Sequence, residues 1–139
     1  MTVEGEVVGQ IRHGLLVLVG VAPQDTVEDA RVLADKLVGL RIFADDDGRM
    51  NRSVSDVAGG VLVVSQFTLY GDARKGRRPS FTGAAQPDRA APLVDLVAEC
   101  ITAAGVEVAT GVFGAMMAVE LLNDGPVTLI LEVEDGKLH

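Results

Sequence analysis

The 139-residue sequence has little of the chemistry that most hydrolases use. It contains one cysteine, Cys100, two histidines, His13 and His139, no tryptophan and only 4% aromatic residues. A single cysteine excludes an intrachain disulfide and a multi-cysteine metal site. His13 lies beside a glycine in a turn-like stretch and His139 ends the chain, which disfavours a Ser-His-Asp or Cys-His centre. We therefore expect no metal and no other cofactor.

Long apolar runs are also missing. The longest, Leu15 to Val19, is too short to span a bilayer, and no secretory signal opens the chain. Apolar residues make up 48% of the sequence, which excludes a disordered chain, and the length suits one domain. We predict a single domain over residues 1–139, without a membrane partner and located in the cytoplasm.

The charge balance is acidic but uneven. A net charge of −8 argues against general binding to nucleic acid, DNA included. However, five of the twelve basic residues fall between positions 74 and 89: Arg74, Lys75, Arg77, Arg78 and Arg89. Such a patch can bind phosphate locally. A solvated loop is the alternative.

The periodicity predicts strands that alternate with two helices. One helix is expected from an N-cap at Asp25, with Glu28 three residues later, to about Arg41, and a second from Asp88 to Gly105. Cys100 lies on the apolar stripe of the second helix, which predicts a buried core thiol. Strands are expected at 3–11, with a hairpin or bulge, and at 14–21, 60–64, 106–110, 116–122 and 127–133. This order predicts a mixed α/β fold, either a mixed β-sheet or a partly closed barrel with two packed helices, with an antiparallel tail.

Three polar stretches interrupt this pattern. The aspartates of "FADDDGRMNRSVSD" lack the spacing of a calcium loop, so a solvated turn at Asp47–Gly48 is expected. "SQFTLYGD" places polar side chains directly after a buried strand, either to line a cleft or merely to cap the strand end. "NDGPVT" has strong turn chemistry and, from composition alone, favours an ordinary hairpin turn.

Taken together, these stretches resemble a known family. "VVSQFTLYGD", "KGRRPSF" and "VELLNDGPVT" are similar to the motifs of the D-aminoacyl-tRNA deacylases (D-tyrosyl-tRNA(Tyr) deacylases), proofreading enzymes that hydrolyse D-amino acids from tRNA. "GLLVLVGV", "LRIFADDDGRMN" and "AGVFGAMMAVEL" extend the similarity over nearly the whole chain. The resemblance implies a homodimer with each active site at the interface. It also implies a cis Gly125–Pro126 bond whose backbone carbonyls enter the partner's pocket and exclude L-amino acids.

The resemblance also assigns roles residue by residue. It makes Ser65, Gln66, Phe67 and Thr128 the catalytic residues, and Thr68, Leu69, Asn123 and Val127 the remaining lining of the substrate pocket. The threonine was once taken as a nucleophile, but the family implies RNA-assisted chemistry by the terminal 2′-hydroxyl. Placement of that hydroxyl needs no histidine. The basic run after "SQFTL" is expected to bind tRNA through Arg74, Lys75, Arg77 and Arg78.

One departure and two alternatives stay open. Family members usually carry about a dozen more residues before the point that matches Thr2, including a strand with an arginine that supports the Gly-Pro loop. Either the start of this sequence is misassigned or the edge strand is lost, and for the sequence as given we expect reduced stability or activity. A non-catalytic tRNA-binding module would use the basic loop alone. A small-ester hydrolase would use Thr128 or Thr68 as nucleophile. Glycyl-tRNA is a further expected substrate, because glycine lacks the side chain by which L-amino acids would be excluded.

Overall fold

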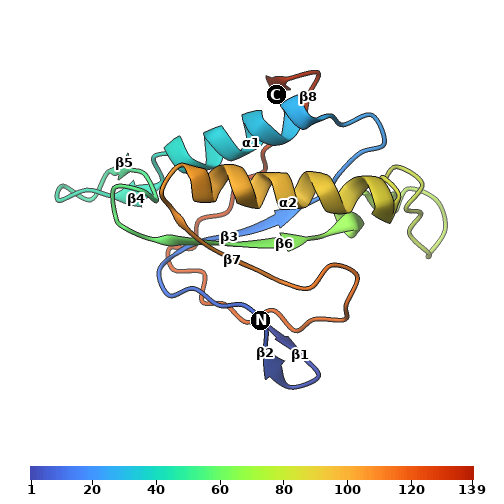
Figure 1. The fold of residues 1–139 in the computed structure, drawn as a ribbon, viewed down its shortest axis with the longest axis horizontal. Helices are drawn as coiled ribbons and strands as arrows, with labels where there is room; N and C mark the ends of the chain where they lie inside the picture. The colour runs from blue at the N-terminus through green and yellow to red at the C-terminus, as the bar shows by residue number, and fades with distance from the viewer.

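A three-stranded parallel sheet forms the centre of the computed structural model, which describes residues 1–139. Its strands are β3 (Gly14–Val19), β6 (Gly60–Ser65) and β7 (Glu107–Thr110), in the order β3-β6-β7. Two crossover helices connect them, α1 (Val27–Gly39) and α2 (Pro87–Ala103), as parallel neighbours require. Figure 1 shows both helices side by side on one face of the sheet. The mixed α/β prediction is confirmed, but the sheet stays open and no barrel closes.

Alternation along β6 builds two cores. Val61 and Val63 are almost fully buried and belong to the large core between the sheet and the helices. Leu62 and Val64 point the other way into a small core with Met1. The chain before β3 and the chain after β7 run along that second face (Figure 1). Because both faces are covered, β6 reads as a continuous apolar run.

The helix boundaries differ from the predicted ones at their caps. The N-cap of α1 is Thr26 with Asp29 in a capping box, and not Asp25 with Glu28. Both pairs have a cap residue followed three positions later by an acid, so the pattern alone was ambiguous by one residue. Pro87 occupies the first turn of α2, and its N-cap is Gln86, not Asp88. The left-handed φ of +88° at Gly105 ends that helix as expected. Cys100 packs against the large core but is only half-buried.

Short antiparallel hairpins surround the sheet. β1 (Thr2–Val3) pairs with β2 (Glu6–Val7), β4 (Phe43–Ala44) with β5 (Met50–Arg52), and β8 (Val133–Glu134) with β9 (Lys137–Leu138). The first agrees with the predicted hairpin near the start of the chain. The last was not predicted, although Asp135 and Gly136 both have positive φ and form the type of two-residue turn that Asp-Gly favours.

The prediction of two tail strands, 116–122 and 127–133, is wrong for this chain. Only Ala118 in this region makes a ladder contact, an antiparallel bridge with Thr2. A strand needs a neighbour for its backbone groups, and a single chain supplies none here. Met116, Leu122 and Ile130 are 92%, 91% and 86% exposed as a result. None of the helices has the length and apolar character needed to cross a membrane.

Candidate functional site

The first polar cluster lies where β6 ends. The backbone amide of Gln66 donates to the Val19 carbonyl at 2.7 Å, which continues the β3–β6 pairing one residue beyond the strand. The chain then turns into η1 (Phe67–Tyr70), a 3₁₀ helix. Ligands of open α/β sheets bind beyond the carboxyl ends of the parallel strands, and Ser65 and Gln66 occupy that edge. Their position therefore suits a binding cleft better than a simple strand cap.

The side chains of this cluster are held by local contacts. The Gln66 side-chain amide donates to Thr68 Oγ1, and the Leu69 amide donates to the Gln66 carbonyl at 3.2 Å. The Phe67 ring meets Phe81 edge-on, with 5.1 Å between ring centroids. Phe67, Thr68 and Leu69 remain exposed, so this face is open to a ligand.

The second cluster is a turn around Gly125 and Pro126, whose peptide bond is cis. Asn123 closes this turn with both ends of its side chain. Its Oδ1 accepts from the Val127 amide at 3.0 Å, and its Nδ2 donates to Thr128 Oγ1 at 2.9 Å. Every residue from 120 to 130 except Val127 is exposed. The backbone of the turn is therefore available to another molecule.

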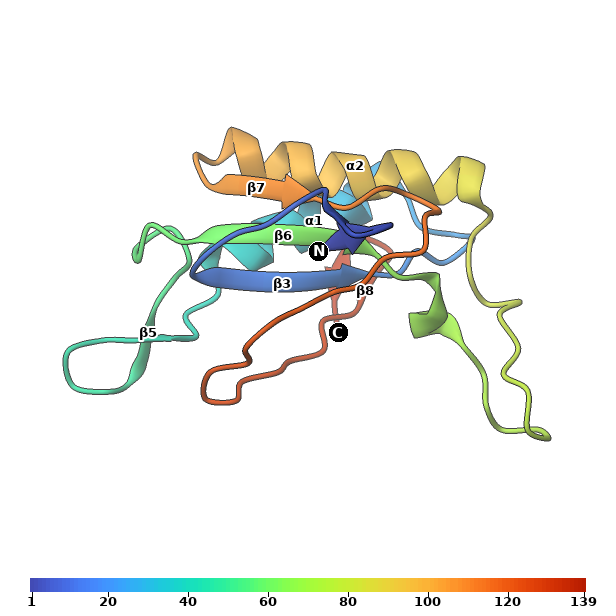
Figure 2. The same ribbon diagram turned by 90° about the horizontal axis from the view of Figure 1, so that it is seen from below.

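The two clusters do not meet within one chain. In Figure 2, the orange-to-red loop with residues 120–130 and the segment from η1 onward both project beyond the β3 edge of the sheet, but well apart along the molecule. No hydrogen bond joins residues 65–69 to residues 123–128. The structure thus assembles each half of the predicted site but does not combine them in a single protomer.

The basic loop contains two kinds of cation. Arg74 donates to both carboxylate oxygens of Asp72, at 2.9 and 2.7 Å, and its backbone amide donates to the same carboxylate. The Arg74 side chain holds the pKa of Asp72 below its usual range. Lys75, Arg77 and Arg78 are exposed and form no salt bridge. These three side chains have no carboxylate partner, whereas Arg74 shapes the loop through Asp72.

A cavity of about 80 Å³ lies beside the strand ends and was not predicted. Tyr70, Asp25 and Glu132 are part of its lining. Burial raises the pKa of Tyr70, and the nearby Asp25 carboxylate raises it further. Gly20 lets the Tyr70 ring approach, because a Cβ there would lie 3.1 Å from the ring. The only sequence signal that Tyr70 would line this cavity is its position at the end of the motif "SQFTLY".

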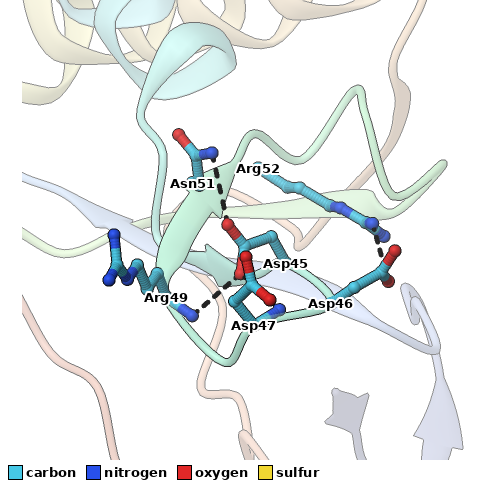
Figure 3. A network of polar contacts seen from close by, with 6 residues as sticks. All are labelled: Asp45, Asp46, Asp47, Arg49, Asn51 and Arg52. Carbon is cyan, nitrogen blue, oxygen red and sulfur yellow. Dashed lines mark hydrogen bonds and ion pairs between the residues drawn. The ribbon is translucent and has the colours of Figure 1, made fainter.

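The aspartate-rich loop is a self-contained turn, as predicted (Figure 3). Asp45 Oδ1 accepts from the backbone amides of Asp47 and Arg49 at 2.9 and 3.0 Å. The Arg49 and Asp47 amides lower the pKa of Asp45, and Arg52 pairs with Asp46 at 3.0 Å. The structure contains no group of three or more His, Cys, Asp or Glu side chains arranged to hold a metal ion.

These features define an α/β protein with an open polar strand edge and a separate exposed turn, and comparisons place it more narrowly. The profile of the family described as D-Tyr-tRNA(Tyr) deacylase matches residues 1–132. The D-aminoacyl-tRNA deacylase of Geobacillus sp. (strain WCH70) is 62% identical over 135 residues, which cover 97% of this chain and 89% of that protein. That of Chloroflexus aurantiacus is 59% identical over 138 residues, 99% of this chain and 86% of the relative. The chain belongs to the D-Tyr-tRNA(Tyr) deacylase family.

Two solved structures support the fold. One, entitled c-Myc DNA Unwinding Element Binding Protein, superimposes with a TM-score of 0.88 at 35% identity and covers 96% of this chain and 91% of its own. Another, described as a probable eukaryotic D-amino acid tRNA deacylase, has a TM-score of 0.62 at 21% identity over 73% of this chain and 75% of its own. The second comparison concerns the fold alone.

Proposed function

We infer that this protein is a D-aminoacyl-tRNA deacylase, an ester hydrolase, and propose that the backbone at Gly125–Pro126 selects the D-configuration. The observation that supports this role is the geometry of the turn. It exposes Gly125 and Pro126 at its tip, and Asn123 braces it from within. Backbone carbonyls recognise the α-carbon without reading a side chain. Such a device suits an enzyme that must accept many amino acids of one chirality.

The proposed site is completed across a dimer. A protomer presents its strand-edge cluster and its turn apart from each other but both beyond the β3 edge of the sheet (Figure 2), so the turn of each copy can enter the pocket of the other in a two-fold dimer. Met116, Leu122 and Ile130 flank that turn and are each more than 85% exposed. Monomers rarely expose such apolar patches, and a two-fold partner would bury them together with the unpaired backbone of the tail. The partner thus supplies both the missing strand neighbour and the missing half of the site.

Hydrolysis at this site depends on placement more than on strong acids or bases. Ser65, Gln66 and Phe67 stand at the strand edge, where the terminal adenosine and the ester would lie. The vicinal 2′-hydroxyl is already attached to the substrate, and correct orientation can contribute effective molarities on the order of 10⁵–10⁸ M. Backbone amides after Gln66 can add oxyanion stabilisation of about 3–4 kcal/mol per donor.

Lys75, Arg77 and Arg78 would hold the acceptor stem through its phosphates. They lie in the loop that follows η1 and carry no carboxylate partner. Phosphate contacts carry little sequence information, which fits an enzyme that meets many tRNAs. Because the rest of the surface is acidic, this attachment would be local.

The alternative of a threonine nucleophile gains no support. Thr128 Oγ1 accepts from the Asn123 amide and Thr68 Oγ1 accepts from the Gln66 amide. Neither hydroxyl has a histidine or lysine within hydrogen-bond reach to remove its proton. Both threonines are placed as acceptors that fix neighbouring groups.

The deciding experiment compares D-tyrosyl-tRNA with L-tyrosyl-tRNA as substrates of the purified protein. Rapid release of D-tyrosine with the L-ester left intact supports the proposal. Binding of tRNA that weakens with salt, without ester cleavage, would instead indicate a non-catalytic module. A duplex DNA competitor belongs in the same assay, since one structural relative is described as binding a DNA element. We predict that it displaces aminoacyl-tRNA poorly, because duplex DNA carries no aminoacyl ester for the strand-edge site.

A further inference from the structure

Asp29 is the one charged side chain among the buried residues. It is 6% exposed, and Ser53 is the only other polar residue that is buried to a similar degree. Asp29 lies in the first turn of α1, far in sequence from both clusters of the proposed site. Buried carboxylates are kept only where several partners satisfy them. The partners of Asp29 therefore indicate what it holds.

Each Asp29 oxygen binds a different part of the chain. Oδ2 accepts from the Thr26 amide at 3.0 Å and lies 3.4 Å from the Thr26 hydroxyl, which forms the capping box of α1. Oδ1 accepts from the Gly136 amide at 2.7 Å, across 107 positions of sequence. Burial raises the pKa of Asp29, but the bonds from Gly136 and Thr26 outweigh it and leave the pKa lowered. The carboxylate is thus charged at neutral pH, and the bond to Gly136 is charge-assisted.

Gly136 belongs to the turn of the β8–β9 hairpin, which packs on α1. Its φ is +72°, and a Cβ at this position would lie 3.3 Å from the Glu28 side chain. A side chain there would be strained and crowded, so glycine lets the turn approach the helix closely. Asp29 holds the turn against the helix through its shortest hydrogen bond, which it accepts from the Gly136 amide at 2.7 Å.

The β8–β9 hairpin is one of two anchors for the selecting turn, which is the exposed turn around Gly125–Pro126. β8 begins seven residues after Pro126, and Leu131 packs against the large core just before it. The other anchor is Ala118, which exchanges two backbone hydrogen bonds of 2.9 Å with Thr2. Between the anchors, residues 120–130 make only the internal bonds of Asn123. The direction in which the turn projects is therefore set at its two ends.

We propose that Asp29 is a positioning residue for chiral selection, because it holds the β8–β9 hairpin on α1 and so fixes where Gly125–Pro126 is presented. The inference rests on the proposed function of that turn. Asp29 touches no substrate. Its effect is on the placement of a backbone that must exclude one enantiomer, where a displacement of about 1 Å can cost about 100-fold in rate.

The test compares Asp29→Asn with the matched control Thr26→Ala. Both changes weaken the cap of α1, but only Asp29→Asn removes the charge and one of the two acceptors, which loosens the hairpin. The measured quantity is the ratio of kcat/KM for D-tyrosyl-tRNA to that for L-tyrosyl-tRNA. We expect this ratio to fall about tenfold or more in Asp29→Asn and to stay within about twofold of wild type in Thr26→Ala. A mere loss of folded protein lowers both rates equally and leaves the ratio unchanged.

The outcomes separate the two claims. If the wild-type ratio is high and Asp29→Asn leaves it unchanged, Asp29 is only a helix cap and the inference is overturned. If Thr26→Ala lowers the ratio as much as Asp29→Asn, cap stability explains the effect and the inference is equally overturned. A wild-type protein without D-selectivity would remove the proposed function itself. Faster amide hydrogen exchange over residues 127–136 in Asp29→Asn, but not in Thr26→Ala, supports the anchoring step independently.

Discussion

Replacing Asn123 by alanine tests whether the selecting turn is preorganised by its own side chain. The change removes both hydrogen bonds that close the turn, those to Val127 and Thr128. Each is worth about 0.5–1.5 kcal/mol in general, and exposure places these two toward the lower end. A loss of about 1–2 kcal/mol lowers the ratio of closed to open turn by a factor of about 5–30.

We expect kcat/KM for D-tyrosyl-tRNA to fall in Asn123→Ala, by up to that factor, because only the closed turn completes the site. The thermal midpoint of unfolding should hardly change, because the turn is exposed and buries no core surface. Asn123→Asp is the matched control: its carboxylate still accepts from the Val127 amide, and the Thr128 hydroxyl can donate to it. Wild-type kcat/KM in Asn123→Ala, or an equal loss in Asn123→Asp, would refute the reasoning.

Three further predictions concern other parts of the molecule. Changing Lys75 and Arg77 to glutamine should weaken tRNA binding and lower the slope of log K against log salt by about one per residue, whereas an unchanged slope in a salt titration would exclude them as phosphate contacts. Ile130→Asp should shift the protein from dimer to monomer in sedimentation equilibrium, and a persistent dimer would mean that the tail is not at the interface. Because the pKa of Asp29 is lowered from 3.8, its stabilisation is present above that pH and lost as the pH falls through the folded-state value. Urea unfolding below pH 4 should therefore show a shallower pH dependence in Asp29→Asn, and an identical dependence would contradict this.

The sequence predicted the parts of the fold that depend on local patterns. The runs at 14–21 and 60–64 became the two adjacent parallel strands β3 and β6, and the helical periodicities became α1 and α2. Apolar continuity and 3.6-residue spacing are local, so they can be read without knowing the partner. Cap positions shifted because Asp25 and Thr26 are both good N-caps, and only the packing decides between them.

Features that depend on a distant or external partner could not be predicted in this way. The apolar alternation at 116–122 and 127–133 suits a strand, yet a strand forms only against a neighbour. The hydrogen bond between Asp29 and Gly136 spans 107 positions, and no local pattern predicts it. The residues of both clusters belong to the quoted motifs, but their separation within the protomer became visible only in the structure.

The central claim, a site shared between two subunits, can be tested directly by complementation. Gln66→Ala damages the pocket and Pro126→Ala damages the turn, and each variant alone should be nearly inactive on D-tyrosyl-tRNA. Mixing and reassembling them in equal amounts makes about half the dimers hybrid, and each hybrid has one site with an intact pocket and an intact partner turn. The account predicts recovery of about a quarter of wild-type activity. Hybrid dimers that form and remain inactive would contradict it.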